Sequence, residues 1–556
     1  MSPIPLYFRQ IIKKSVSSLT RGASGLAFRS RLVSVSRLAS PALVVGAVLV
    51  ALFLGLLRQP DQFPGAPARA DSATPSLIGI ADAVYQSESY RNSGEIPYLA
   101  PGSGSDRRNL AVETPALFTH PLYFALQRFL PLGLSMTVLV ILHVFLGAVA
   151  AFYLARRCRY GPLPSLFASL VFFLTGKLLS SGTQRADEIG YLLVAAVFPA
   201  VVLAAMRVLQ RPTVIRGSVF GLCVALCACA GDAGGAVFAF LLLAISVPIT
   251  YFLLDVRAFT GKTVTALAGG FVWGLALGGY RWLPAIIDGD VSPLARAFEG
   301  LPWWSHLEGI SLPYHLGAVT LITVLLGLRN LTRQKSSAPV LLLGTVGIVL
   351  AVLGPPSSLP FLGLYFGLLG AAAFSGFLVV YRPAVREVLA TCGIAFLIFE
   401  AMPHHAEALK GNTYAEIASV LETESTPDRG IPDSGHPSGR ATFHEASVLP
   451  FSAPLGDLTA LVNAKPASLF SVGNDRLELA LPAGTHEVHM RFSPPGLELG
   501  QTLSAMAAAL MPFLFAWPLL RRRNLERSGR HLPPHRFLRG RRVKRKEPQR
   551  QTVSVG

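Results

Sequence analysis

The stretch LGLSMTVLVILHVFLGAVAAFYLARRCR, which runs from Leu132 to Arg159, decides the fold class of this chain. Its first part, 132–154, is apolar and uncharged, and it is long enough to cross the hydrocarbon core of a bilayer as an α-helix. Arginines follow at once, and cations directly after an apolar run are typical of the cytosolic end of a transmembrane helix. The stretch therefore predicts a membrane-spanning helix that ends in the cytosol.

Similar apolar runs recur along the chain, and every second loop between them is basic. Roughly 33 of the 49 Lys and Arg residues fall in these basic loops and tails, whereas roughly 27 of the 31 Asp and Glu residues fall on the other side. The pattern predicts an all-α polytopic membrane protein of about twelve transmembrane helices with both termini in the cytosol. The expected crossings are 41–57, 132–154, 163–179, 189–206, 217–231, 236–254, 264–281, 313–328, 338–354, 361–380, 384–400 and 501–520.

The composition narrows the class of protein and the expected partners. A chain that is 51% hydrophobic and 14% charged is a membrane protein and not a soluble enzyme. The net charge of +18 lies mostly in the predicted cytosolic loops and tails, so the expected partners there are anionic lipid headgroups and not nucleic acid. All five cysteines fall in apolar runs or on the basic side, so no disulfide framework is expected.

The alternation also predicts the domain organisation. Two outer segments are long, 58–131 and 401–500, and loops of this length usually carry function. In the second segment, Arg476–Leu481 alternates between apolar and polar residues, a turn follows at Pro482–Gly484, and the alternation then resumes. This pattern predicts a β-hairpin, and hence a small extracytoplasmic β-module before the last helix. The expected order is a basic cytosolic tail (1–40), transmembrane helices one to eleven (41–400), the β-module segment (401–500), the last transmembrane helix (501–520) and a second basic cytosolic tail (521–556).

The first outer loop contains two segments with helical periodicity. Ser76–Asn92 predicts a short amphipathic helix, and Thr114–Leu130 predicts a second helical stretch that is interrupted at Pro121. We expect both segments to lie along the outer membrane surface.

Several motifs together resemble the bacterial YfhO-like membrane proteins. They are GEIPYLAP (Gly94–Pro101) with the segment that continues to Arg157, CAGDAGGAVFAFLLL (Cys229–Leu243), GYRWLPAIIDGDVSPLAR (Gly279–Arg296) and LALPAGTHEVHMRFSPPGLELGQTLS (Leu479–Ser504). That family is grouped with the GT-C glycosyltransferases. The resemblance implies a GT-C-like fold, a polyprenyl-phosphate sugar donor, an active site at the outer face and a catalytic acid in the first outer loop.

Sugar transfer from a polyprenyl phosphate needs a carboxylate that accepts the proton of the acceptor hydroxyl, and cations that hold the phosphate. The catalytic acid that the resemblance implies falls on Asp71 or Asp82, and the sequence leaves both open. The candidate substrate-binding residues lie in outer loops or near the outer ends of crossings: Arg107, Arg108, Lys177, Arg185, Asp232 and Arg281. We expect no metal site and no cofactor, and the sequence leaves a divalent-metal requirement open.

The predicted function is therefore a membrane glycosyltransferase that moves a sugar from a polyprenyl-phosphate donor to a cell-surface glycan or lipid acceptor, in the bacterial inner membrane. A transporter or flippase of a lipid-linked precursor is one alternative, although its charges should lie in the middle of crossings. A non-catalytic assembly protein of the GT-C fold is another. It is favoured by Tyr98–Pro101, where YfhO-like proteins usually have an aromatic residue followed by Asn-Pro.

Overall fold

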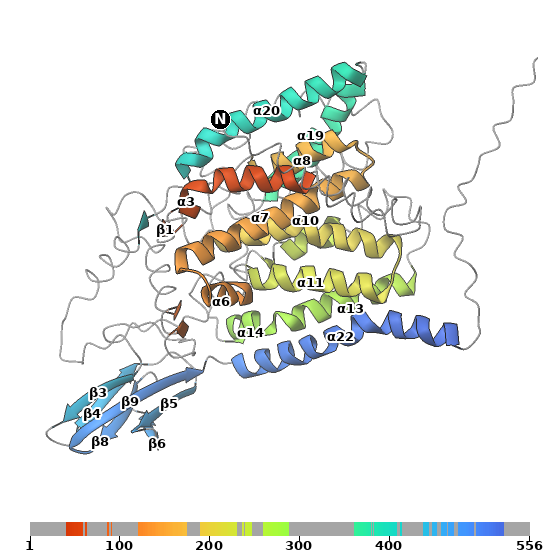
Figure 1. The fold of residues 1–556 in the computed structure, drawn as a ribbon. Coiled ribbons are helices and arrows are strands. Elements are labelled where there is room, and N and C mark those ends of the chain that lie inside the picture. The colour runs from red at the N-terminus through yellow and green to blue at the C-terminus, as the bar shows by residue number, and fades with distance from the viewer. Residues whose placement is uncertain are drawn as a thin grey trace, which may run out of the picture.

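The computed structural model describes the chain in ranges separated by gaps. They are 41–58, 62–63, 86–87, 90–91, 120–174, 189–230, 236–237, 239–246, 260–287, 361–379, 381, 383–408, 412–413, 438–443, 447–452, 457–463, 465–471, 476–493 and 496–527. In these ranges the helices lie side by side as a bundle, and most of the strands lie together at one end of it (Figure 1).

The helices follow the apolar runs of the sequence. A first helix covers Pro41–Leu52. The labelled helices are α3 (Leu54–Arg58), α6 (Pro121–Gln127), α7 (Leu132–Arg157), α8 (Pro162–Leu174), α10 (Ile189–Gln210), α11 (Val214–Ala230), α13 (Gly261–Leu277), α14 (Gly279–Ile287), α19 (Leu362–Val379), α20 (Pro383–Ala408) and α22 (Leu497–Arg527).

Three helical segments of the described residues are apolar and long enough to cross a membrane, namely 132–157, 192–210 and 497–516. Four shorter apolar helices accompany them. A largely helical membrane protein is thereby confirmed. The count of about twelve crossings is not confirmed and stays a prediction, because the predicted crossings 313–328 and 338–354 lie outside the described residues.

The three long segments differ in what surrounds them. Other parts of the protein bury 94% of the segment in α10 and 61% of that in α7, but only 11% of that in α22. An apolar helix that neighbours enclose belongs to the protein core, whereas one left uncovered is suited to contact lipid. α10 and α7 therefore form the centre of the bundle, and α22 lies at its edge, as Figure 1 also shows.

Small residues set the spacing between α11 and α13. A Cβ added at Gly221 would lie 2.5 Å from the carbonyl oxygen of Gly270, and one added at Gly270 would lie 2.5 Å from the carbonyl oxygen of Gly217. The two helices therefore touch backbone to backbone, and this contact depends on the missing side chains. Close contacts of this type drive helix association in lipid, where burial of apolar surface contributes little.

The last helix is attached to α13 and α14 by hydrogen bonds. Trp273 Nε1 donates to the carbonyl of Ala507 at 2.9 Å, and the N–H of Tyr280 donates to Ser504 Oγ at 3.0 Å. Ser504 Oγ in turn donates to the carbonyl of Ala276 at 3.2 Å. These bonds fix α22 against the bundle even though most of its surface is uncovered.

The short strands β1 (Gln62–Phe63) and β2 (Asn412–Thr413) pair antiparallel. They belong to the two long segments that the sequence assigns to the outer side of the membrane. The pairing therefore brings parts of both segments together at one end of the bundle (Figure 1).

The remaining strands form two sheets ahead of α22. One sheet has the order β3-β9-β5-β6 and the other β4-β8-β7, and all neighbouring strands are antiparallel. Their bounds are β3 (Ser438–Phe443), β4 (Ser447–Ser452), β5 (Asp457–Val462), β6 (Lys465–Ala467), β7 (Leu469–Ser471), β8 (Arg476–Leu481) and β9 (Gly484–Ser493).

The predicted hairpin is wrong in its pairing. Both of its strands exist as β8 and β9, but each pairs within a different sheet, so the turn between them passes from one sheet to the other. Alternating apolar residues predict a strand and its buried face, and Leu479 and Leu481 are indeed buried. Alternation does not predict the partner strand, because any strand with a matching face satisfies it.

Candidate functional site

The candidate site is built around α6, the short helix that precedes the membrane helix α7. Pro121 is its first residue, where the missing N–H costs nothing, and His120 caps the helix by accepting a hydrogen bond at Nδ1 from the N–H of Leu122 at 3.2 Å. Pro121 therefore starts a helix, whereas the sequence predicted an interruption within a longer one.

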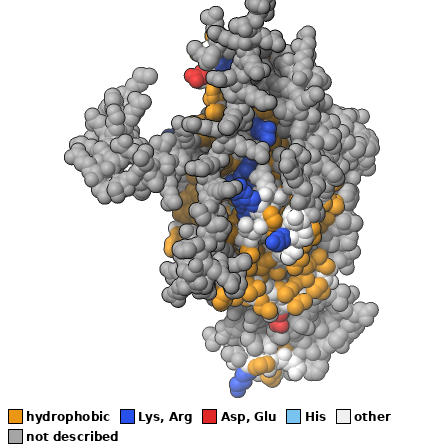
Figure 2. Space-filling model, turned by 90° about the vertical axis from the view of Figure 1, so that its right-hand side faces the viewer, with side chains coloured by type: hydrophobic (Ala, Val, Ile, Leu, Met, Phe, Trp, Pro, Cys, Tyr) orange, Lys and Arg blue, Asp and Glu red, His pale blue; other side chains and the backbone are white. Residues whose placement is uncertain are grey.

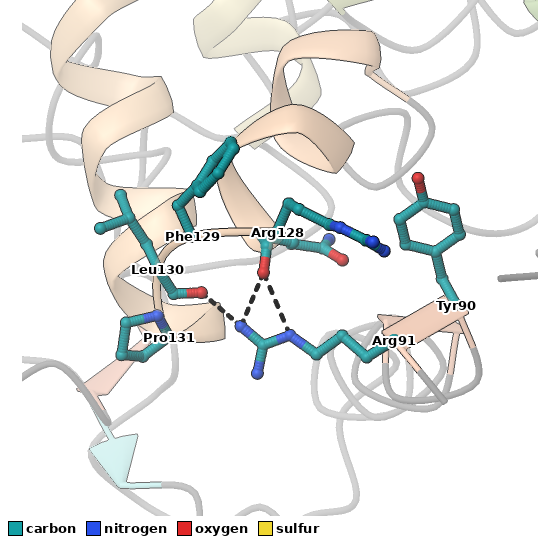
Figure 3. Close-up of a pocket in the computed structure, with 7 residues that line it drawn as sticks. Tyr90, Arg91, Arg128, Phe129, Leu130 and Pro131 are labelled. Atoms are coloured by element: carbon teal, nitrogen blue, oxygen red, sulfur yellow. Dashed lines mark hydrogen bonds between the residues drawn. The ribbon is translucent and has the colours of Figure 1, made fainter. Parts of the chain in front are cut away.

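Arg91 covers the C-terminal end of α6. Its Nε and Nη2 donate to the carbonyl of Gln127 at 3.2 and 2.9 Å, and Nη2 also donates to the carbonyl of Leu130 (Figure 3). The last carbonyls of a helix lack intrahelical donors and carry partial negative charge, so a guanidinium stabilises them. These bonds hold the side chain of Arg91 in one orientation.

A cavity of about 590 Å³ lies beside this contact. Figure 3 shows the side chain of Arg128 extending toward Tyr90, while that of Arg91 extends toward Leu130. Among the described residues the lining includes two cations and no acid, together with aromatic and apolar side chains: Tyr90, Arg91, Gln127, Arg128, Phe129, Leu130 and Pro131. Such a cavity suits an anion that carries an apolar group.

The two arginines differ in their bonding. Arg91 is held by backbone carbonyls, whereas the guanidinium of Arg128 makes no hydrogen bond or ion pair to any residue in the described ranges. Arg128 can therefore offer its donors to a ligand, and Arg91 provides a second positive charge at a fixed position.

A buried polar network holds the segment around Arg91 against α6. Gln127 Nε2 donates to Ser87 Oγ at 3.0 Å, and Ser87 Oγ lies 3.5 Å from the hydroxyl of Tyr123. Burial raises the pKa of Tyr123 to about 12, so its phenol stays neutral. The ring of Tyr90 packs edge-on against Phe124, with centroids 5.1 Å apart. Together these contacts position Tyr90 and Arg91 at the cavity.

Two histidines join α6 to α7. The rings of His120 and His143 lie edge to face with centroids 4.9 Å apart, and His143 Nδ1 donates to the carbonyl of Leu139 in its own helix at 2.9 Å. His120 is fully buried, and its Nε2 has no hydrogen-bond partner among the described residues. Burial, followed by the charge of His143, lowers the pKa of His120 to about 3, so His120 is neutral at ordinary pH.

Most of the residues that the sequence nominated cannot be placed at this site. Arg281 is the nominated residue in the described ranges; it is buried in α14 and does not line the cavity. The others lie outside the described residues and stay predictions: Asp71, Asp82, Arg107, Arg108, Lys177, Arg185 and Asp232.

The sequence reasoning missed Arg91 and Arg128. A signal existed for Arg91, because Tyr90 and Arg91 fall in the predicted amphipathic helix of the first outer loop. No sequence pattern indicated Arg128, because it lines the cavity only together with Tyr90 and Arg91, which lie far from it in the chain.

Comparisons with known proteins give likenesses in structure alone. No family model matches the chain, and no curated protein matches it. The resemblance to YfhO-like proteins therefore stays a prediction.

Similar solved structures include an oligosaccharyltransferase from Archaeoglobus fulgidus, with 10% identity, a TM-score of 0.43, and coverage of 71% of this chain and 58% of that one. The arabinofuranosyltransferase AftD from Mycobacteria has 18% identity, a TM-score of 0.43, and coverage of 67% and 26%. ArnT from Cupriavidus metallidurans, bound to undecaprenyl phosphate, has 14% identity, a TM-score of 0.38, and coverage of 70% and 77%.

Scores below 0.5 do not establish a common fold, so no function of this chain follows from these likenesses. The chain also spans about 58% of the length of the archaeal enzyme and 26% of the mycobacterial one.

Proposed function

We propose that this protein transfers a sugar from a polyprenyl-phosphate donor to an acceptor at the outer face of the bacterial inner membrane, and that the α6 cavity holds the donor phosphate. One observation carries the proposal: the guanidinium groups of Arg91 and Arg128 share a cavity with Phe129, Leu130 and Pro131, directly before the membrane helix α7. A lipid phosphate needs this combination of cations and apolar surface at the level of the headgroups.

The two arginines have different roles in this proposal. Arg91 is held by two carbonyls and provides a preorganised charge that needs no rearrangement when phosphate binds. Arg128 provides free donors, and a guanidinium can bind a phosphate through two parallel hydrogen bonds. When the sugar leaves the phosphate, both charges stabilise the negative charge that develops on the leaving group.

The proton acceptor in this proposal is Asp71 or Asp82. Its carboxylate takes the proton of the acceptor hydroxyl as the new glycosidic bond forms and the bond to the phosphate breaks. Asp82 is favoured by its spacing in the predicted helix Ser76–Asn92. It precedes Tyr90, which lines the cavity, by eight residues, and residues four and eight apart lie on the same face of a helix.

The test uses the full chain, purified in lipid. Binding of undecaprenyl phosphate is measured by native mass spectrometry, and transfer is followed from a panel of radiolabelled polyprenyl-phosphate monosaccharides. Arg128→Gln is expected to weaken binding about tenfold, since one charge-assisted contact is lost. Asp82→Asn is expected to abolish transfer and leave binding unchanged, with Asp71→Asn as its matched comparison.

Arg159→Gln is the control for charge, because Arg159 follows the opposite end of α7. Equal weakening by Arg128→Gln and Arg159→Gln would show that the cavity holds no phosphate. If the wild-type protein binds the lipid but transfers no sugar from any donor, and flips labelled lipid between leaflets, the flippase reading replaces the enzyme.

A further inference from the structure

Four arginines gather where α7, α10 and α11 meet, at the end of the bundle opposite the strands. Arg157 ends α7, Arg207 and Arg211 lie at the end of α10, and Arg216 lies in the first turn of α11. We call this group the arginine cluster. Figure 2 looks onto this end and shows Lys and Arg side chains in the middle of the face, with no Asp or Glu beside them among the coloured residues.

Hydrogen bonds fix two members of the arginine cluster. Arg157 Nη1 donates to Gln210 Oε1 at 2.6 Å, which ties α7 to α10. Arg216 Nη1 donates to the carbonyls of Arg207 and Arg211 at 2.9 and 3.2 Å, and so covers the C-terminal end of α10. Two of the four arginines are therefore held in place, and the backbone of the other two accepts the bonds from Arg216.

Its charge is not balanced within the described part of the chain. Arg157, Arg207 and Arg211 are all close enough to Arg216 for their charges to repel it. No acidic side chain in the described ranges pairs with any of the four, and the guanidinium groups of Arg207 and Arg211 make no hydrogen bond there. Like charges held together in this way attract an anion that the described residues do not supply.

The position of the cluster indicates which anion. Two of the long apolar segments, 132–157 and 192–210, end at or beside its members, so it lies where a bilayer changes from hydrocarbon to headgroups. Val214 and Ile215 precede Arg216 and are 46% and 38% exposed, so apolar surface adjoins the charge. A soluble phosphate would use the charge alone, whereas a phospholipid would use both.

We propose that the arginine cluster binds the phosphate of an anionic phospholipid in the cytosolic leaflet, and that its acyl chains extend into the bilayer core. The site lies at the other end of the bundle from the α6 cavity and does not depend on the proposed sugar transfer. The lipid would neutralise the repulsion among the arginines and hold the ends of the three helices together.

The experiment uses the full chain in a neutral detergent. Thermal unfolding and native mass spectrometry are recorded with dioctanoyl phosphatidylglycerol, dioctanoyl phosphatidylcholine or inorganic phosphate. Phosphatidylglycerol is expected to stay bound and to raise the unfolding temperature above the values with the other two. The double variant Arg207→Gln/Arg211→Gln is expected to bind phosphatidylglycerol about thirtyfold more weakly, because each cation near an anionic headgroup contributes favourably.

The matched control is Arg382→Gln/Arg386→Gln, which removes the same charge from the predicted cytosolic side outside the cluster. It is expected to change binding less than about twofold. Equal weakening by both double variants would overturn the proposal in favour of net charge alone. Equal stabilisation by inorganic phosphate, or by phosphatidylcholine, would overturn it as well.

Discussion

The two ends of the bundle use the same chemical group in different surroundings. At the end that carries α6, Arg91 covers the last carbonyls of a helix and shares a half-open cavity with Arg128. At the opposite end, Arg216 covers the last carbonyls of α10 in the same manner, but its neighbours are three more arginines on an open face.

In both places a guanidinium that caps a helix remains positively charged and can attract an anionic ligand. The residues around it then determine which kind of anion fits. A cavity that combines two cations with aromatic and apolar side chains favours specific recognition of one kind of molecule. An open group of like charges favours any anionic headgroup of the bilayer surface.

The largest effect is expected from reversing one charge at each end. Arg128→Glu should weaken binding of undecaprenyl phosphate about a hundredfold, because an attraction becomes a repulsion inside a cavity. Arg211→Glu should leave that binding within about twofold, because it lies at the other end of the bundle. Native mass spectrometry of both variants with the same lipid measures the contrast, and equal losses would mean that the ends are not distinct.

A change in the helices that connect the two ends should lower the stability of the whole bundle. Gly270→Ala is expected to lower the free energy of unfolding by about 2 kcal/mol, because the new methyl group meets the carbonyl oxygen of Gly217. Gly269→Ala has open space around the new Cβ and should stabilise the protein by up to about 1 kcal/mol. Chemical unfolding of the two variants in detergent compares them, and effects of the same sign would contradict the close contact.

The end with α6 is expected to respond to pH through His120. The pKa of His120 in the folded protein, about 3, lies below the ordinary value of 6.5. Between these pH values, His120 is protonated in the unfolded chain but stays neutral in the folded protein. Stability should therefore fall as the pH falls from 6.5 toward 3, by about 2 kcal/mol at pH 5.

His120→Asn keeps a capping acceptor for α6 and removes the titration. The variant should lose less stability than the wild type between pH 7 and pH 5 in thermal unfolding. If the variant kept the pH dependence of the wild type, other titratable groups would be responsible for the loss of stability.

The smallest effect is expected within the polar network. Tyr123→Phe removes the contacts of the phenol with Ser87 and Gln127 and keeps the buried ring, so the free energy of unfolding should fall by about 1 kcal/mol. Gln127→Leu removes the stronger bond to the Ser87 hydroxyl and should cost more. A larger loss for Tyr123→Phe would mean that the phenol has a further role at the cavity.

Parts of the site could be predicted from the sequence and parts could not. The sequence predicted a functional role for the first outer loop, and the cavity beside α6 includes Tyr90 and Arg91 of that loop but none of the nominated residues. Arg91 and Arg128 meet because Arg91 bonds to carbonyls at the end of α6, and a backbone carbonyl has no signature in sequence. For the same reason the alternation in Arg476–Leu481 predicted a strand but not its partner.

By itself the sequence determined that this is a helical membrane protein whose predicted loops alternate between basic and acidic. The length of the apolar runs and the distribution of charge between them are properties of the chain that govern how it inserts into any bilayer. The tertiary structure decided which arginines stand together, which strands pair, and which apolar helix is enclosed and which faces outward. These features depend on distances between residues far apart in the chain, and such distances arise when the helices pack.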